Sequence, residues 1–224
     1  MTTDADDPHA GQPVIPAGAP VDDSETVVIL IHGRNASPEN ILTLVPRLNR
    51  PGVAFLAPAA AGHTWYPYSF LTETTKNEPH LSSALRVIGR LLEELAARGI
   101  TRDRVLLMGF SQGACLCAEF AVRHATRYGG LVLFSGGLIG PPGTTWVHPE
   151  RFDGTPVFLG CSDVDAHIPK GRVEESAEVF RRMGADVTMR LYPGMGHVVN
   201  EDEIDAARLM IEGVVSRSVE NFRD

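Results

Sequence analysis

The chain has 224 residues, which fits one domain with a single hydrophobic core. Hydrophobic residues make up 43% of it and charged residues 21%, as in ordinary globular proteins, and the formal net charge is −8. Nucleic acids and anionic membranes are bound by clustered lysine and arginine side chains, so this acidic balance argues against both as partners. No apolar run approaches the roughly 20 residues that a membrane-spanning helix needs, so stable membrane insertion is not expected.

The N-terminal segment MTTDADDPHAGQ is polar and acidic. We expect residues 1–12 to form a disordered tail, followed by a single domain over 13–224. The segment lacks a basic region followed by an apolar one, so it does not resemble a secretory signal. The three cysteines of the chain form no CxxC pair and no cluster with zinc-ligand spacing. We therefore expect buried free thiols, no metal site and a cytoplasmic protein.

Short apolar segments alternate with longer amphipathic ones along the rest of the chain. Residues 13–20 are expected to form a short edge hairpin, because their prolines exclude a central strand. Most of the next six segments are apolar on both faces, as strands of a covered parallel sheet are. These predicted strands are Thr26–Ile31, Val53–Ala57, Arg104–Met108, Gly130–Phe134, Thr155–Leu159 and Asp186–Leu191.

Helical patterns fill the intervals between the predicted strands. Ser37 and Pro38 are the residue types of an N-cap and a first helical position. The longest helix is expected over Glu78–Arg98, where leucines recur at helical spacing before Gly99. The other predicted helices are Gln112–His124, Val173–Met183 and Asp202–Ser216. Because strands and helices alternate, the sequence predicts an α/β domain with a mainly parallel sheet.

A candidate nucleophile lies in the segment GFSQG, residues 109–113, which matches the G-x-S-x-G pattern of a nucleophile elbow. The segment follows a predicted strand and opens a predicted helix, which is the context that this motif requires. The free N–H groups at the start of the helix are suited to a developing oxyanion. The pattern and its context predict that Ser111 is a nucleophile rather than part of an ordinary tight turn.

A serine hydroxyl needs a base within hydrogen-bond reach and a third group that orients this base. In such elbows the carboxylate and then the histidine follow the serine along the chain. Asp163 and Asp165 both lie in the loop after a predicted strand. We prefer Asp165, which is near the middle of this loop and four residues before Pro169, but spacing alone leaves Asp163 open as a rival. His197 follows a strand and a glycine-rich turn, so we predict that it is the base, whereas His167 is expected only to line the loop.

Two backbone N–H groups are expected to stabilise the oxyanion. One is the N–H of Gln112, directly after the nucleophile. The other is the N–H of Arg34, in the segment IHGRNAS that follows an early strand. Gly33 permits the backbone to approach closely there, which favours this interpretation over an ordinary turn.

Five segments occur in an order that resembles a known family: LIHGRNAS, APAAAGHTWYPYSF, GFSQGA, GCSDVDAHIP and PGMGH. Over roughly residues 13–211 the chain is similar to the phospholipase/carboxylesterase family of α/β-hydrolases, which includes small bacterial carboxylesterases and the acyl-protein thioesterases. The resemblance implies the α/β-hydrolase fold, with helices on both faces of the sheet. It also implies a triad and two oxyanion donors, namely Ser111, Asp165, His197, Arg34 and Gln112.

The resemblance selects Asp165 over Asp163, because the acid of the family stands in a D-x-x-[VI]-P stretch. Two segments depart from the family pattern: HGRN stands where the thioesterases typically carry HGLGD, and HTWYPYSF differs from the usual aromatic stretch. Both flank the predicted acyl pocket. In the long predicted loop over 62–79, four aromatic residues are expected to line the apolar entrance of this pocket, namely Trp65, Tyr66, Tyr68 and Phe70. For each of them the alternative is packing inside the loop.

The sequence thus predicts a serine hydrolase that cleaves carboxylic esters through an acyl-enzyme and needs no cofactor. Short to medium acyl chains are expected, because a chain of this length leaves little room for a separate lid domain. The alternatives are a thioesterase or a lysophospholipase with the same triad, or an acyltransferase with an alcohol as acceptor. A non-catalytic binding protein of the same fold is a further alternative, against which the intact Ser, Asp and His set argues. The sequence is compatible with a homodimer.

Overall fold

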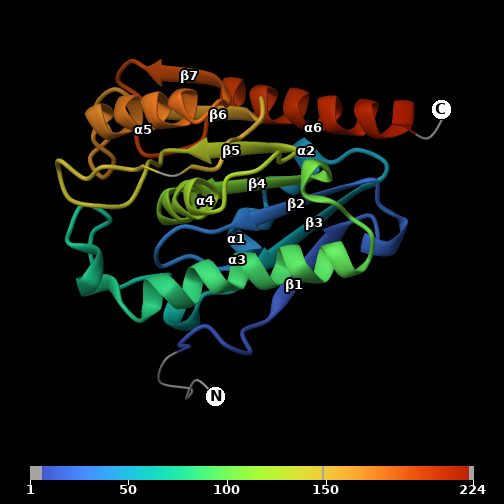
Figure 1. Ribbon diagram of the computed structural model, residues 1–224, viewed down its shortest axis with the longest axis horizontal. Coiled ribbons are helices and arrows are strands. Elements are labelled where there is room, and N and C mark those ends of the chain that lie inside the picture. Colours follow the sequence, from blue (N-terminus) through green and yellow to red (C-terminus); the bar gives the residue numbers. More distant parts are fainter. Residues whose placement is uncertain (1–6, 148, 222–224) are drawn as a thin grey trace.

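The computed structural model describes residues 7–147 and 149–221 and contains a seven-stranded sheet with the order β1-β3-β2-β4-β5-β6-β7 (Figure 1). Strand β1 runs antiparallel to β3, and every other neighbouring pair is parallel. The strands are β1 Val14–Gly18, β2 Thr26–Ile31, β3 Val53–Pro58, β4 Val105–Phe110, β5 Gly130–Phe134, β6 Pro156–Ser162 and β7 Asp186–Tyr192. The predicted α/β class with a mainly parallel sheet is confirmed.

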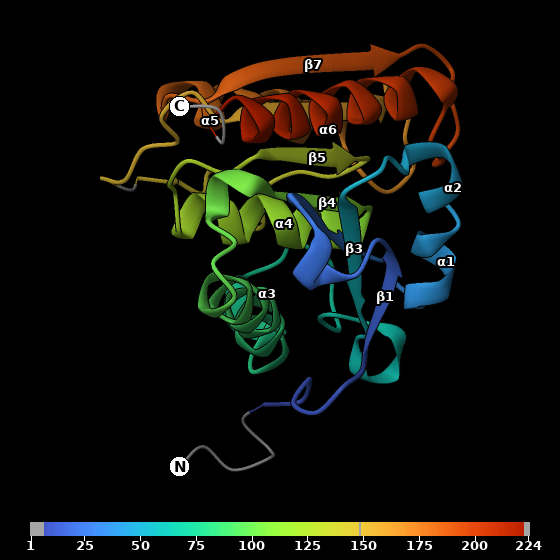
Figure 2. The same ribbon diagram turned by 90° about the vertical axis from the view of Figure 1, so that its right-hand side faces the viewer.

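Helices cover both faces of the sheet (Figures 1 and 2). They are α1 Pro38–Leu42, α2 Val45–Leu48, α3 His80–Ala97, α4 Gln112–Arg123, α5 Lys170–Arg182 and α6 Glu201–Asn221. Side chains of α3, α4 and α5 pack on one face, and side chains of α1, α2 and α6 pack on the other. In the described ranges, no helix is both long enough and apolar enough to cross a membrane.

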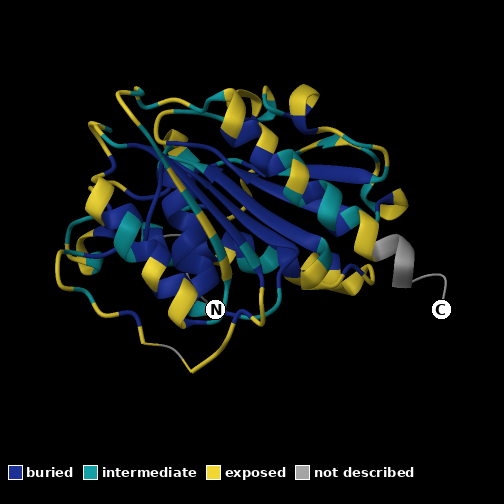
Figure 3. Cartoon of the chain, turned by 90° about the horizontal axis from the view of Figure 1, so that it is seen from above, coloured by how far each residue is buried: buried dark blue, intermediate teal, exposed yellow. Residues whose placement is uncertain are grey.

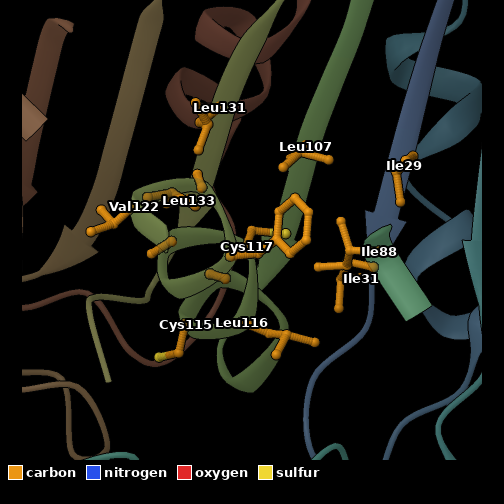
Figure 4. Close-up of a cluster of buried hydrophobic side chains, with 14 of the residues drawn as sticks. Ile29, Ile31, Ile88, Leu107, Cys115, Leu116, Cys117, Val122, Leu131 and Leu133 are labelled. Carbon is orange, nitrogen blue, oxygen red and sulfur yellow. The ribbon is translucent and has the colours of Figure 1, made fainter. Parts of the chain in front are cut away.

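The central strands are buried on both faces because residues along a strand alternate between the two layers. In β2, Val27 and Ile29 point into the cluster with α3 and α4, whereas Val28 and Leu30 point into the cluster with α6. Figure 4 shows part of the first cluster, to which Leu107 of β4 and Cys117 of α4 both belong. Figure 3 shows the result, with buried strands at the centre and exposed residues on the outer sides of the helices.

The N-terminal segment differs from the expected disordered tail. Residues 1–6 lie outside the described residues, but Asp7 and His9 contact α3, while residues 10–12 are exposed. The Asp7 carboxylate accepts hydrogen bonds from Ser83 Oγ and, at 2.8 Å, from Arg90. The His9 side chain is buried and hydrogen bonded at both ring nitrogens. Residues 7–9 therefore depart from the expected tail, because ion pairing and hydrogen bonding satisfy polar groups that composition alone assigns to solvent.

The segment 13–20 forms an edge strand, as its prolines predict, but it does not form a hairpin. Its strand β1 pairs with β3, so its partner lies more than thirty residues further along the chain, with Val14 opposite Pro58. The chain between them contains β2, which lies on the other side of β3. The two sheet edges are thus β1 and β7, and the carboxyl ends of β2, β4, β6 and β7 lie toward one side of the molecule.

Candidate active site

Ser111 stands on a strained turn between β4 and α4. Its backbone has φ 56° and ψ −120°, a region that residues with a side chain rarely occupy. A methyl group on Gly113 would overlap the carbonyl oxygen of Ile31, and one on Gly109 would lie 2.5 Å from the carbonyl carbon of Gly113. The Ser111 N–H donates to the Phe134 carbonyl at 2.9 Å, which secures the turn to β5. The two glycines are therefore required by close approach, and the serine hydroxyl projects away from the backbone.

The structure brings Ser111, Asp165 and His197 together, from loops that follow β4, β6 and β7. His197 Nε2 lies 2.9 Å from Ser111 Oγ, and His197 Nδ1 lies 2.7 Å from Asp165 Oδ2. An ionised carboxylate only accepts hydrogen bonds, so Nδ1 carries the proton and Nε2 is free to accept from the hydroxyl. This is the geometry in which an imidazole acts as a general base on a serine.

The Asp165 carboxylate is ionised although its side chain has no exposed surface. Its Oδ1 accepts backbone N–H groups from His167 at 2.8 Å and Ile168 at 3.0 Å. Burial opposes ionisation, but the bond from His197 and these two N–H groups outweigh it and hold the pKa of Asp165 below its ordinary value. Asp163, the rival on spacing, instead accepts the Gly194 N–H at 2.8 Å and links the two loops.

The two N–H groups expected to bind an oxyanion flank the serine. Gly33 passes over the elbow so closely that a Cβ on it would lie 3.5 Å from the Ser111 Cβ. In the described part of the chain, neither the Arg34 N–H nor the Gln112 N–H donates to a protein acceptor. Both donors are thus available to a ligand atom next to Ser111. Gln112 is also the first residue of α4, so its N–H lies at the helix end where the dipole favours negative charge.

A cavity of about 540 Å³ opens beside the triad. Its wall is formed by the oxyanion loop, the aromatic loop, the elbow and the loops of the acid and the base. It includes Gly33, Arg34, Asn35, Ala36, Tyr66, Pro67, Tyr68, Ser69, Phe70, Phe110, Ser111, Gln112, Cys115, His167, Ile168 and His197. Three of the four expected aromatic residues, Tyr66, Tyr68 and Phe70, line it, and Tyr68 is 57% exposed at its rim.

Trp65 does not line the cavity, contrary to the sequence-based expectation. Its indole is fully buried in the core, and Nε1 donates to the His32 carbonyl at 2.9 Å. Its backbone N–H donates to the side-chain oxygen of Gln112 at 2.9 Å, and Gln112 Nε2 donates to the Tyr66 carbonyl at 2.8 Å. Trp65 therefore anchors the loop to the elbow from inside, while the next residue faces the cavity.

Two further cavity residues, Phe110 and Ile168, were not predicted from the sequence, and the side chain of Arg34 makes contacts that were not predicted. Phe110, the variable residue of the elbow motif, packs against the His197 ring at 4.8 Å between centroids. Ile168 adds an apolar surface next to the acid loop. The Arg34 guanidinium donates to the carbonyls of Pro67 and Tyr68, both at 2.7 Å, and thereby holds the aromatic loop. Each of the three stands in a motif segment, Phe110 in GFSQG, Ile168 in the D-x-x-[VI]-P stretch and Arg34 in IHGRNAS, but no motif indicates these side-chain contacts.

Among the described residues that line the cavity there is no carboxylate side chain, and Arg34 contributes a guanidinium. In the described ranges, no group of three or more His, Cys, Asp or Glu side chains is placed to hold a metal ion. The arrangement thus offers a nucleophile, a base and backbone donors at one wall of an apolar cavity.

Comparison with known proteins agrees with this geometry. A family model described as Phospholipase/Carboxylesterase matches residues 14–214. Acyl-protein thioesterase 1 of Eremothecium gossypii is 29% identical over 149 residues, which cover 64% of this chain and 62% of that protein. The match thus spans less than two thirds of the length of that relative.

Solved structures match over more of the chain. A phospholipase/carboxylesterase from Dyadobacter fermentans is 37% identical and superposes with a TM-score of 0.85, covering 90% of this chain and 97% of that one. The Bacillus cereus carboxylesterase is 20% identical with a TM-score of 0.74, over 92% of this chain and 95% of that one, which shows the shared fold. On these matches, the chain belongs to the phospholipase/carboxylesterase family and has the α/β-hydrolase fold.

Proposed function

We propose that the chain is a serine hydrolase that cleaves carboxylic esters, with Ser111 as nucleophile, His197 as base and Asp165 as the group that orients the base. The observation that carries this proposal is the single imidazole that bridges the other two side chains at 2.9 Å and 2.7 Å beside a cavity. The cavity volume of about 540 Å³ falls in the range of about 300–1,000 Å³ that small-molecule sites occupy. Substrates with short to medium acyl chains are part of this proposal.

In the proposed reaction, Ser111 Oγ attacks the ester carbonyl carbon while His197 Nε2 takes the hydroxyl proton. The carbonyl oxygen becomes an oxyanion, which the N–H groups of Arg34 and Gln112 stabilise. His197 then donates the proton to the leaving alcohol, and an acyl-enzyme remains. Water attacks this ester with the same base, and the acid is released. Asp165 stays ionised throughout and stabilises the imidazolium.

The aromatic loop is proposed to bind the acyl or the alcohol part of the substrate through Tyr66 and Phe70, with Tyr68 at the entrance. Their apolar ring surfaces face the cavity in which Ser111 stands. The three cysteines are buried free thiols, which supports a reducing, cytoplasmic location as part of this proposal.

The test is hydrolysis of p-nitrophenyl butyrate by the wild type and by Ser111→Ala, with fluorophosphonate labelling of the wild type. We expect turnover by the wild type and a loss of kcat of about 10⁴-fold or more in the variant. A folded wild type that neither turns over the ester nor reacts with the fluorophosphonate would refute the proposal.

A thioesterase is the second candidate, because relatives such as that of E. gossypii are named acyl-protein thioesterases. The same triad attacks either carbonyl, so the two functions differ only in the preferred substrate. We would compare kcat/KM for a butyryl oxygen ester and the matching butyryl thioester. A ratio of more than about tenfold in favour of one, corresponding to about 1.4 kcal/mol in transition-state binding, assigns the preference.

A further inference from the structure

His32 is a buried histidine next to the site that the proposed triad does not use. Its side chain is only 1% exposed, and both ring nitrogens have partners. Nε2 lies 3.1 Å from the Ala60 backbone N, and Nδ1 lies 2.8 Å from the Gly33 carbonyl oxygen. Because a backbone N–H only donates, Nε2 accepts and the ring proton resides on Nδ1. His32 is therefore neutral, in one tautomer, and donates to Gly33.

The Gly33 carbonyl belongs to the same peptide unit as the Arg34 N–H. This peptide is trans and planar, so its C=O and N–H point in opposite directions. Holding the carbonyl on the His32 side therefore directs the N–H to the opposite side. Glycine itself imposes little restriction on the rotation of this unit, and the other bond to the carbonyl, from the Ala36 N–H, is longer at 3.3 Å.

We propose that His32 is a positioning residue of the oxyanion hole, whose Nδ1–H fixes the Gly33–Arg34 peptide so that the Arg34 N–H faces the reacting carbonyl beside Ser111. This inference rests on the proposed function. Burial also lowers the pKa of His32, which keeps the ring neutral in the neutral pH range. A protonated ring would lose its bond from Ala60, since both of its nitrogens would then be donors.

The chain contains a matched control for this role in His9. Its side chain is also 1% exposed, Nε2 donates to the Trp65 carbonyl at 2.9 Å, and Nδ1 accepts the Ala61 N–H at 3.1 Å. The rings of His9 and His32 both pack against Trp65, with centroids at 5.4 Å and 5.0 Å. The two neutral imidazoles thus accept hydrogen bonds from the consecutive N–H groups of Ala60 and Ala61. Of the two, His32 is the one that also donates to the carbonyl of the Gly33–Arg34 peptide.

Two amide substitutions test separately the hydrogen bonds that the two ring nitrogens of His32 make. In His32→Asn the short amide reaches the place of Nδ1 and can donate to the Gly33 carbonyl. In His32→Gln the longer amide reaches the place of Nε2 and can accept from Ala60, but offers no donor to Gly33. Loss of one oxyanion donor costs about 100- to 1,000-fold in kcat, and a misdirected donor is expected to cost part of this.

With p-nitrophenyl butyrate we expect His32→Gln to lower kcat by about 10- to 100-fold while KM changes by less than about threefold. His32→Asn should keep kcat within about threefold of the wild type. The control His9→Gln should lower Tm but keep kcat within about threefold at a temperature where it is folded. Equal kcat values for the two His32 variants, or a change confined to KM, would overturn the positioning role.

A wild-type measurement covers the case in which a variant does not fold. Long-range ¹⁵N–¹H spectra of the histidine rings should show His32 as the neutral Nδ1–H tautomer at pH 8; the Nε2–H tautomer or a cation would overturn the proposal. The outcomes also separate the two proposals. An inactive wild type refutes the hydrolase, whereas an active wild type with equivalent His32 variants refutes the positioning role alone.

Discussion

Glu203 is a buried acid whose replacement should change how the stability of the protein depends on pH. It lies in the first turn of α6 with no exposed surface. Its Oε2 accepts the Asn200 N–H at 2.9 Å, and Asn200 Oδ1 accepts the Glu203 N–H at 2.9 Å. The other oxygen, Oε1, is buried against Gly160 and has no hydrogen-bond partner among the described residues. Burial therefore raises the pKa of Glu203 from the ordinary 4.5 to about 7.

The magnitude follows from this difference in pKa. At about 1.36 kcal/mol for each pKa unit, a rise from 4.5 to about 7 corresponds to about 3 kcal/mol. Between these pH values the folded protein holds the Glu203 proton more tightly than the unfolded chain does. The contribution of this group to the free energy of unfolding is therefore full below pH 4.5 and is lost as the pH rises through about 7.

The assay is urea unfolding of the wild type and Glu203→Gln between pH 4.5 and pH 8. The difference in the free energy of unfolding should shift by about 3 kcal/mol in favour of the variant across this range. Other titrating groups are common to both proteins and cancel in the difference. Glu212→Gln is the control, because Glu212 lies on the same helix but is partly exposed and paired with Arg50. A difference that stays constant with pH for Glu203→Gln would refute the reasoning.

Three further predictions concern the supports of the site. Gly113→Ala should lower Tm by more than about 5 °C and kcat with it, because its methyl group would overlap the Ile31 carbonyl; an unchanged calorimetric Tm would contradict this. Arg34→Met keeps the backbone N–H but removes two hydrogen bonds to the aromatic loop, so KM should rise about 3- to 10-fold. A fall in kcat with unchanged KM would argue against a role of the Arg34 side chain in holding this loop. Asp7→Ala should cost about 1–2 kcal/mol in urea unfolding through lost contacts with Ser83 and Arg90 of α3, and no change would mean that these contacts add no stability.

The sheet was largely predictable because strands buried on both faces must be apolar at successive positions. The predicted Thr26–Ile31 and Gly130–Phe134 coincide with β2 and β5. The end of β6 was not predictable: it continues to Ser162, three residues beyond the expected Leu159. Gly160 and Ser162 interrupt the apolar pattern, but their backbone pairs with β7 at Arg190 and Tyr192. Backbone pairing across strands leaves no trace in hydrophobic periodicity.

The positions of Ser111 and His197 could be predicted because each depends on a local pattern at the end of a strand. For the acid, the local pattern left Asp163 and Asp165 open, and only the family resemblance selected Asp165. The cavity could not be predicted in the same way. Whether Trp65 or Tyr66 faces it depends on hydrogen bonds from the aromatic loop to Gln112, which is 46 to 47 residues away. Such loops have no periodicity, and their conformation follows from long-range contacts that no local pattern encodes.

Buried titratable groups in the fold respond to acid with opposite signs. Burial lowers the pKa values of His9 and His32, so their contribution to stability is present above the ordinary 6.5 and is lost as the pH falls below it. Glu203 instead destabilises the fold as the pH rises from 4.5 toward 7. Mild acid therefore weakens the loops around Trp65 and Gly33 while it strengthens the first turn of α6. We therefore expect acidification to disturb the hydrogen bonds that His32 makes on the oxyanion side of the site.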